Sequence, residues 1–509
     1  MKSNFGYGIL VSLLLCLSNI TLASSLTDLG EGSANFSSEQ VLNNDHGQYR
    51  HWLSIGRVLM NGSQCTGSLI DTHGTRTKRD GPAYVLTAGH CVDSNADRFT
   101  LNAPASGEVI FNYFKDTQSR QLAYPITRIV WGTRRGGDIA IVELDRSLKQ
   151  LMDDGIMPLE LARQPVPIGS DVLIVGAPFS GFMMRVACKQ GASADVFEAG
   201  FAWFDQLSNR CEGVRSGVSG SPLLTRYSNE ILGVIGTTTR TGGHTRCAPD
   251  SPCEITNGIP RKSQGTNYAT SAVRLAHCFR AGRFAPQDTH CPLGPSSDFG
   301  PRHDENYVRV ARDKRGNFTR IQWKQTFTLD QPFHRIKYTR TLSDCANSEG
   351  YGPARPTHAN DTDTSIYTLR AGPGFYFLCV VGQRHKHVSR NRWAVRNARV
   401  YWRWAQMGPI NSAPLYRLFE SIENTFIITP IDVAPDQIEG PYDYKVVQWQ
   451  GSDCRDLEGY QRLDPDLWSF TVSVVDGPRR VCLRGHDITG NPSPAADFQL
   501  PGSADRRNR

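Results

Sequence analysis

The sequence has little of what marks membrane, nucleic-acid-binding and zinc proteins. Beyond the N-terminus no run approaches about 18 uninterrupted apolar residues, so no transmembrane helix is expected. The formal net charge is only +7 over 509 residues, and Lys and Arg are scattered except in the tail at 502–509, which argues against a nucleic-acid partner. No C-x-x-C or H-x-x-x-H spacing accompanies Cys65, His90 and Cys91, which argues against zinc. We therefore expect no metal and no other cofactor.

The N-terminus has the pattern of a secretory signal peptide. Lys2 precedes an apolar stretch at 8–17, and small residues near Ala23 offer a cleavage point. Cys16 follows a Leu, so a lipid anchor is not expected, and the other 12 of the 13 cysteines form an even set suited to an oxidising compartment. We expect residues 1–23 to be removed, residues 24–49 to be an N-terminal extension or propeptide, and the protein to be extracellular or periplasmic.

Two motifs supply the elements of a serine nucleophile. Thr-Ala-Gly-His-Cys at 87–91 provides a histidine, and Gly-Val-Ser-Gly-Ser-Pro at 217–222 provides a serine between glycines. A serine hydroxyl needs an imidazole base, and the imidazole needs a carboxylate to orient it. Asp138 directly precedes a short apolar run that predicts a buried strand. Taken singly, a glycine-flanked serine, a core histidine or a strand-capping aspartate is common, but the order His90, Asp138, Ser219 favours a catalytic triad.

These segments resemble the trypsin-like, chymotrypsin-fold serine endopeptidases. The resemblance is carried by the motifs at 65–70, 85–91, 138–140 and 217–222 and extends over residues 50–280. It implies two six-stranded antiparallel barrels with the triad in the cleft between them. The backbone N–H groups of Gly217 and Ser219 are then expected to form the oxyanion hole.

The sequence departs from the zymogen-activated members of that family at two places. Val218 stands where those relatives carry an Asp that pairs with a new amino terminus, and no Ile-Val-Gly-Gly start precedes the first cysteine motif. We therefore expect a non-zymogen type, similar to the glutamyl endopeptidases, whose activity needs no specific new N-terminus near Trp52. A site that has drifted out of use is the other interpretation.

The specificity pocket is predicted from its position relative to Ser219. The family's pattern places Gly213 at the floor and Thr237 and Thr238 on the wall, which are small and neutral and favour an uncharged side chain at the cleaved position. Arg240 and His244 lie close in sequence, which leaves an acidic side chain as an alternative to a plain solvated loop.

The 12 cysteines are expected to form disulfides between neighbours in the sequence. Pairing of the first two resembles the bridge that ties the histidine loop in this family, and the remaining pairs are hypotheses that spacing alone does not establish. The expected pairs are Cys65–Cys91, Cys188–Cys211, Cys247–Cys253, Cys278–Cys291, Cys345–Cys379 and Cys454–Cys482.

The C-terminal part contains an internal repeat. After a Pro-, Gly- and Ser-rich linker at 281–305, the segment at 343–351 recurs at 452–460. Short apolar runs predict two β-sandwich modules, at 306–408 and 409–501, that loosely resemble immunoglobulin-like modules of secreted enzymes. Trp402 and Trp404 form either an exposed platform for a polysaccharide or protein surface or part of a core.

The sequence therefore predicts an all-β secreted serine endopeptidase. Its partners would be protein or peptide substrates, with separately folded C-terminal modules that target it to a cell surface or polysaccharide. An exported adhesion protein with an inactive protease-like domain is the alternative. An α/β-hydrolase esterase is disfavoured because Ser221 occupies the place of the glycine that such enzymes need, and because His90 lies upstream of Ser219.

Overall fold

The structure is a computed structural model of the whole chain. It describes residues 27–31, 37–73, 80–93, 98–239, 247–293, 297–300, 307–310, 321–357, 363–369, 372–386, 395–407, 413–421, 424–431, 442–451, 453–464, 467, 469–486 and 492–502. The predicted signal peptide and the last residues of the tail lie outside the described residues. No helix among the described residues is long and apolar enough to cross a membrane.

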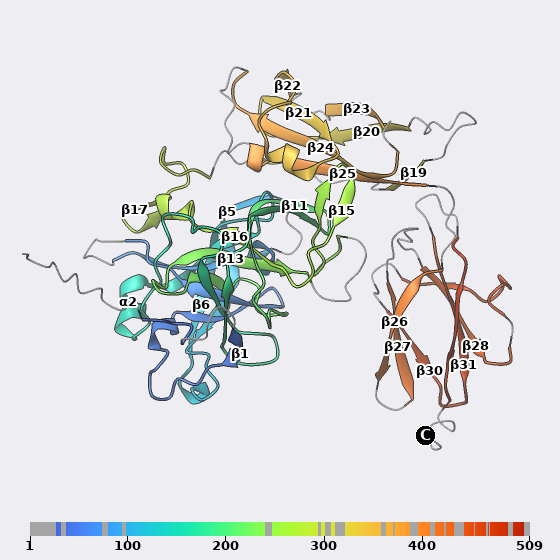
Figure 1. Cartoon of the computed structure of the whole chain (residues 1–509), viewed down its shortest axis with the longest axis horizontal. Coiled ribbons are helices and arrows are strands. Elements are labelled where there is room, and N and C mark those ends of the chain that lie inside the picture. Colours follow the sequence, from blue (N-terminus) through green and yellow to red (C-terminus); the bar gives the residue numbers. More distant parts are fainter. Residues whose placement is uncertain are drawn as a thin grey trace, which may run out of the picture.

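A closed six-stranded antiparallel barrel begins the N-terminal domain, which we define as residues 27–293 (Figure 1). Its order is β2-β3-β4-β7-β6-β5, and the apolar runs of β4 and of the first half of β7 are buried and fill the barrel. The short helix α2 (Leu148–Asp153) follows β7 and starts with a capping box between Ser147 and Gln150. The barrel strands are β2 (Ile55–Met60), β3 (Ser63–Leu69), β4 (Pro82–Thr87), β5 (Phe99–Phe111), β6 (Leu122–Thr133) and β7 (Ile139–Ser147).

The second half of this domain is an eight-stranded sheet, where two six-stranded barrels were expected. Its order is β1-β9-β8-β12-β13-β16-β11-β10. A bridge between Gln190 and Asn209 brings the ends of β9 and β11 together, and the Cys188–Cys211 disulfide lies beside this seam. The sheet therefore curls into a second barrel-like body with β1 and β10 as added strands. Its strands are β1 (Ser37–Val41), β8 (Asp171–Gly176), β9 (Met184–Lys189), β10 (Ala194–Glu198), β11 (Phe201–Asn209), β12 (Pro222–Thr225), β13 (Ile231–Thr238) and β16 (Asn267–Ser271).

The segment expected as an N-terminal extension or propeptide is part of this sheet. Strand β1 pairs antiparallel with β9, and Leu42 is fully buried in the barrel core. Asp28 accepts hydrogen bonds from Arg226, whose side chain is 3% exposed. The buried Arg185 likewise donates to Leu29 O at 2.8 Å. Asp28, Leu29 and residues 37–42 thus supply a strand and the partners of two buried guanidinium groups. Whether any of the expected extension or propeptide is removed stays a prediction.

We predict that a chain starting at residue 50 is much less stable than one starting at residue 24. Removing one partner of a buried ion pair costs about 3–5 kcal/mol because the remaining charge has no compensation. Thermal unfolding followed by circular dichroism measures the difference, and Asp28→Asn in the longer chain isolates the Arg226 contribution. Equal melting temperatures for the two chain lengths would contradict the structural role of this segment.

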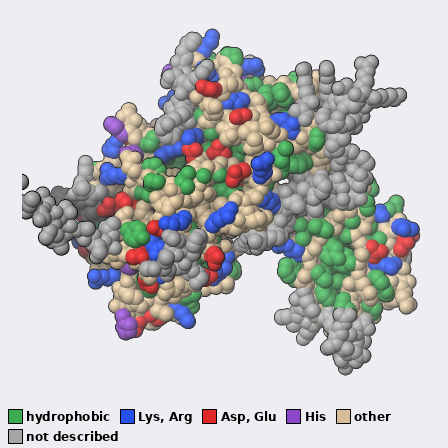
Figure 2. Space-filling model, in the orientation of Figure 1, with side chains coloured by type: hydrophobic (Ala, Val, Ile, Leu, Met, Phe, Trp, Pro, Cys, Tyr) green, Lys and Arg blue, Asp and Glu red, His purple; other side chains and the backbone are tan. Residues whose placement is uncertain are grey.

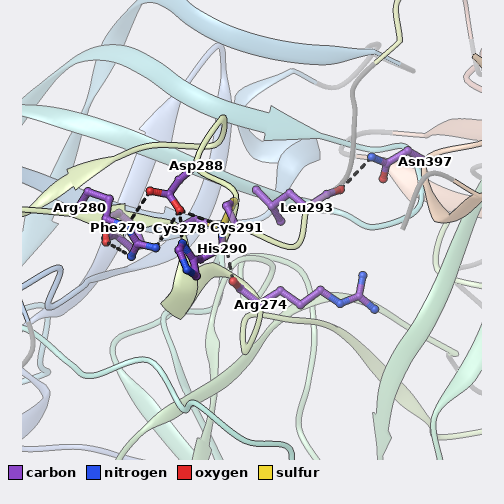
Figure 3. The surroundings of a disulfide bond; sticks show 9 residues. All are labelled: Arg274, Cys278, Phe279, Arg280, Asp288, His290, Cys291, Leu293 and Asn397. Carbon is purple, nitrogen blue, oxygen red and sulfur yellow. Dashed lines mark hydrogen bonds and ion pairs between the residues drawn. A yellow bond between two sulfur atoms is a disulfide. The ribbon is translucent and has the colours of Figure 1, made fainter. Parts of the chain in front are cut away.

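The predicted linker is partly folded onto the N-terminal domain. A hairpin of β17 (Phe279–Arg280) and β18 (Arg283–Phe284) lies within the loop that the Cys278–Cys291 disulfide closes (Figure 3). In the same view, Asn397 of the first sandwich donates from Nδ2 to Leu293 O at 2.9 Å (Figure 3). The hairpin β14 (Glu254–Thr256) and β15 (Ile259–Arg261) also projects toward this sandwich (Figure 1). The described part of the connection up to residue 293 thus contacts both the N-terminal domain and the first sandwich.

The first sandwich lies directly against the N-terminal domain (Figure 1). Phe375, Phe377 and Trp402 form one apolar cluster with Phe197 and Ile255 of the N-terminal domain. The Trp402 side chain is part of this core, so it does not form an exposed platform. The expectation of a separately folded first module is therefore wrong. Its sheets are β19-β25-β24-β21-β22 and β20-β23, with β19 (Tyr307–Val310), β20 (Ile321–Phe327), β21 (Phe333–Thr339), β22 (Arg355–Pro356), β23 (Asp363–Leu369), β24 (Gly374–Gln383) and β25 (Arg399–Met407).

The second sandwich lies to one side of the other two bodies (Figure 1). It has its own apolar core, which includes Ile428, Val481 and Leu483. Its two sheets are β26-β27-β30 and β29-β28-β31-β32, with β26 (Leu415–Ser421), β27 (Thr425–Ile431), β28 (Tyr442–Gln448), β29 (Gln461–Arg462), β30 (Phe470–Ser473), β31 (Arg479–Gly485) and β32 (Ala496–Leu500).

The repeated motif of the two sandwiches has the same structural role in each. In the first, the Tyr351 hydroxyl donates to Cys345 O at 2.8 Å. In the second, Tyr460 donates to Cys454 O at 2.9 Å. Each of these cysteines forms the disulfide of its own sandwich. The repeat therefore encodes a turn that is held by a disulfide and a tyrosine hydrogen bond.

All six disulfides join the pairs that were expected from the sequence. Separations along the chain range from 6 residues for Cys247–Cys253 to 34 residues for Cys345–Cys379. Every bridge closes within the N-terminal domain or within one sandwich.

Candidate active site

His90 and Asp138 are joined by two hydrogen bonds. Helix α1 (Gly89–Val92) follows β4 and carries His90, while Asp138 directly precedes β7. His90 N donates to Asp138 Oδ1 at 2.8 Å, and His90 Nδ1 lies 2.6 Å from Asp138 Oδ2. Because an ionised carboxylate only accepts, Nδ1 carries the proton and Nε2 of a neutral ring is left as an acceptor.

The Asp138 carboxylate is fully shielded from solvent. Its side chain is 0% exposed, against 27% for His90. The Asp138 N–H donates to Thr270 Oγ1 at 2.8 Å, and that hydroxyl donates to Gln206 Oε1 at 3.0 Å. The second half of the domain therefore fixes the residue that orients a histidine of the first barrel.

The charges of the pair shift both pKa values. Burial disfavours the charged ring and lowers the pKa of His90, but the charge of Asp138 and its hydrogen bond outweigh burial, so the pKa of His90 is raised above its ordinary 6.5. Burial raises the pKa of Asp138, but the His90 charge and hydrogen bonds outweigh it, and the pKa of Asp138 is lowered. A negative Asp138 beside a readily protonated His90 is the arrangement that a general base requires.

Ser219 lies at the junction of the two halves of the domain. Its carbonyl oxygen accepts from Thr66 N of β3 at 2.8 Å, and the next residue, Gly220, donates from its N–H to Ile235 O of β13 at 2.8 Å. Gly220 has φ +85°, and a Cβ there would lie 2.3 Å from Thr87 Oγ1. Only glycine fits this contact, which holds the serine turn against the strand that leads into His90.

The loop before Ser219 has a similar close approach at Gly217. Gly217 has φ +92°, and a Cβ there would lie 2.2 Å from Phe179 N. The preceding carbonyl, Ser216 O, accepts from Phe179 N at 2.8 Å. Because the C=O and N–H of one trans peptide point in opposite directions, the Gly217 N–H faces away from Phe179.

The peptide before Ser219 is held in the same manner. Val218 O accepts from Ser221 N at 2.9 Å, so the Ser219 N–H points to the opposite side of that peptide. Within the described part of the chain, neither the Gly217 nor the Ser219 N–H donates to a protein acceptor. Both donors therefore remain available for a ligand oxygen.

Comparison with known proteins identifies the family of the region that contains His90, Asp138 and Ser219. Residues 65–234, which include His90, Asp138 and Ser219, match the family model of the trypsin-like peptidase domain. This part of the chain is a trypsin-like peptidase domain. No curated protein sequence matches the chain.

Solved structures similar to the peptidase domain have low identity. The active form of the Rv3671c protease from M. tuberculosis shares 17% identity, with 46% of this chain and 84% of that chain covered and a TM-score of 0.30. Human heparin binding protein shares 16% identity over 46% and 91%, with a TM-score of 0.29. The MamO protease domain from Magnetospirillum magneticum shares 14% over 43% and 93%, with a TM-score of 0.28. The assignment therefore depends on the family model.

Val218 of the peptidase domain is fully buried among apolar side chains. Its cluster includes Ile174, Val186 and Leu223. A buried carboxylate paired with an amino terminus has no counterpart at this position. Where the zymogen-type relatives carry an Asp, this chain therefore has an apolar side chain packed in the core.

The predicted pocket residues differ in their surroundings. Gly213 is exposed, and a Cβ there would lie 2.9 Å from the Glu39 side chain of β1. Thr237 and Thr238 are 8% and 9% exposed. Arg240 and His244 lie outside the described residues. The assignment of Gly213, Thr237 and Thr238 to a specificity pocket stays a prediction.

A buried acid beside Thr237 was not anticipated from the sequence. Thr237 Oγ1 donates to Glu198 Oε1 at 2.8 Å, and Glu198 is 5% exposed. Burial raises the pKa of Glu198 to about 7, and its charge interacts with that of His90. The sequence signal that could have indicated this acid is its position at the end of the short strand β10.

The group formed by Cys65, His90 and Cys91 does not offer a zinc site. Its ligand atoms lie within 4.8 Å of one another, but the two cysteines are joined in a disulfide. Zinc binds cysteine as thiolate, which a disulfide cannot provide. The same applies to Cys454 and Cys482, which are grouped with Asp497.

We predict that kcat/KM for a small ester falls as the pH drops through the pKa of His90. Only the neutral ring accepts a proton, and because the pKa of His90 is raised, the acid limb should have its midpoint above 6.5. A pH–rate profile measures this midpoint. Glu198→Gln is the control, because Glu198 itself has a pKa of about 7. The acid limb of this variant should remain, with its midpoint at a slightly lower pH because the Glu198 charge also raises the pKa of His90. Loss of the limb in that variant would assign it to Glu198.

Proposed function

We propose that the chain is an exported serine endopeptidase that works through an acyl-enzyme. The observation that carries this proposal is the pair of hydrogen bonds at 2.6 and 2.8 Å between His90 and the buried Asp138. These hydrogen bonds leave Nε2 of the His90 ring free to act as the base. The Ser219 turn packs against β4, the strand that leads into His90. The trypsin-like family match supports the same assignment.

In the proposed mechanism, Ser219 Oγ forms a bond to the carbonyl carbon of the substrate while its proton passes to His90 Nε2. The carbonyl electrons move to the oxygen, where the N–H groups of Gly217 and Ser219 stabilise the negative charge. His90 then gives its proton to the departing amine as the C–N bond breaks. Water, deprotonated by the same nitrogen, releases the acid product and restores Ser219. Asp138 stays ionised throughout and stabilises the protonated ring.

The second sandwich is the part we assign to targeting. Figure 2 shows hydrophobic side chains gathered on the face of this sandwich near β26. Leu415, Leu418 and Phe419 of β26 are 55%, 42% and 53% exposed, which is unusual for a soluble module. The expected target of this face is a protein or polysaccharide surface. Export is supported by the six disulfides.

Active-site titration tests the proposed function. A rapidly acylating 4-nitrophenyl ester should give a burst of nitrophenol close to one equivalent per enzyme, followed by slower turnover. A chain that binds the ester without a burst or turnover would favour the alternative of an exported binding protein with an inactive protease-like domain.

A further inference from the structure

Arg57 is a buried charged residue that the proposed mechanism leaves unused. It belongs to β2 of the first barrel and is 8% exposed. Its Nη2 donates to the carbonyl oxygens of Pro178, Phe179 and Gly181, and its Nη1 to Gln64 Oε1 at 3.1 Å. Among the described residues, no carboxylate forms an ion pair with it.

This guanidinium connects the two halves of the peptidase domain. The carbonyl groups that accept from Arg57 belong to the loop between β8 and β9 in the second half, which we name the 178–181 loop. The Arg57 guanidinium carbon also lies 4.4 Å from the centre of the Tyr113 ring. A buried cation without a carboxylate carries a desolvation cost, and here three of its four hydrogen bonds go to carbonyl groups of one loop.

The 178–181 loop in turn contacts the peptide that carries the first oxyanion donor. Phe179 N donates to Ser216 O at 2.8 Å. The backbone of Pro178 and Phe179 fills the space where a side chain at residue 217 would be, with Pro178 C at 2.7 Å from the position of that Cβ. The direction of the Gly217 N–H is therefore set by the position of this loop.

We propose that Arg57 is a positioning residue for the oxyanion hole, acting through the 178–181 loop. This inference rests on the proposed function. It explains how a peptidase domain with buried Val218 orders its oxyanion loop without an ion pair to a new amino terminus. With Arg57 removed, the three carbonyl oxygens lose their shared donor, the loop shifts, and the peptide between Ser216 and Gly217 loses its fixed direction.

The test compares Arg57→Ala and Arg57→Lys in the full chain with Arg226→Ala. Arg226 is a matched control because its guanidinium is also buried but pairs with Asp28. For a small peptide ester, Arg57→Ala should lower kcat on the order of 100-fold with little change in KM, as for loss of an oxyanion donor. Arg57→Lys should fall in between, because its single nitrogen lacks both the second group that donates to Gln64 and the planar face that packs on Tyr113. Arg226→Ala should lose stability with kcat unchanged.

Two further readouts separate positioning from stability. Guanidinium ion, added far below denaturing concentrations, should restore part of kcat in Arg57→Ala and none in the control. Hydrogen exchange at residues 213–220 should rise in Arg57→Ala more than in Arg226→Ala, and this readout remains if the wild-type chain shows no burst and the proposed function fails. Wild-type kcat in Arg57→Lys or Arg57→Ala, or unchanged exchange at 213–220, would overturn the inference. If Arg57→Ala does not fold, Arg57→Lys alone decides.

Discussion

Ser219→Ala is expected to abolish nearly all peptide hydrolysis, with a fall in kcat on the order of 10⁶-fold. The methyl group cannot attack a carbonyl, and Ser219 is only half-buried, so the substitution leaves the core unchanged. Hydrolysis of a fluorogenic peptide measures the loss, and circular dichroism checks the fold.

Ser221→Ala is the matched control for this variant. Ser221 lies two residues further on and is fully buried, and its Oγ has no hydrogen-bond partner among the residues that the structure describes. Its removal should leave kcat within a few-fold of wild type. If Ser221→Ala were inactive and Ser219→Ala active, the nucleophile would be misassigned.

Asp138→Asn is expected to lower kcat by about 10⁴-fold. The amide would disturb the tautomer of His90 and remove the negative charge that stabilises the protonated ring. The pKa of His90 should fall, because the Asp138 charge is what raises it against burial. The pH–rate profile of the residual activity should therefore have its acid limb at lower pH than in wild type.

The control for Asp138→Asn lies on β7, the strand that directly follows Asp138. Asp145, near the other end of β7, is exposed and pairs with Arg146. Asp145→Asn should have wild-type kcat. An Asp138→Asn variant with nearly full activity would rule out the proposed role of this carboxylate.

The sequence contained enough to predict the peptidase fold because its signals are local. A histidine beside a cysteine, a serine between glycines and an aspartate before an apolar strand each stand in a short segment with restricted geometry. The trypsin-like domain is confirmed by the family match. The triad roles remain a proposal that the hydrogen bonds of His90 and Asp138 support.

The contact between the first sandwich and the peptidase domain could not be predicted from motifs. Strand β24 is buried on both faces: Phe375 and Phe377 face the peptidase domain, whereas Tyr376 and Leu378 face the core of the sandwich. An unbroken apolar run is the signal of a doubly buried strand, but it does not identify what covers the second face. The same limit applies to Arg57 and Glu198, since the groups that contact them are distant in the sequence.

Contact with the first sandwich reaches the loop that carries Asp138. Gly136 has φ +70°, and a Cβ there would lie 2.0 Å from Arg396 O. Arg135 Nη1 donates to Ser297 O at 2.5 Å. The peptidase domain and the first sandwich are therefore one structural unit around the active site, and only the second sandwich retains the character of an appended module.

The most direct test of the account is to map the adduct of a fluorophosphonate probe on the full-length chain by mass spectrometry. The account predicts one adduct per chain, on Ser219, formed in step with the loss of esterase activity. The adduct should be absent from Ser219→Ala and present in Ser221→Ala. No adduct on the folded wild-type chain, or an adduct on another residue, would contradict the proposal that this protein is a serine endopeptidase acting through Ser219.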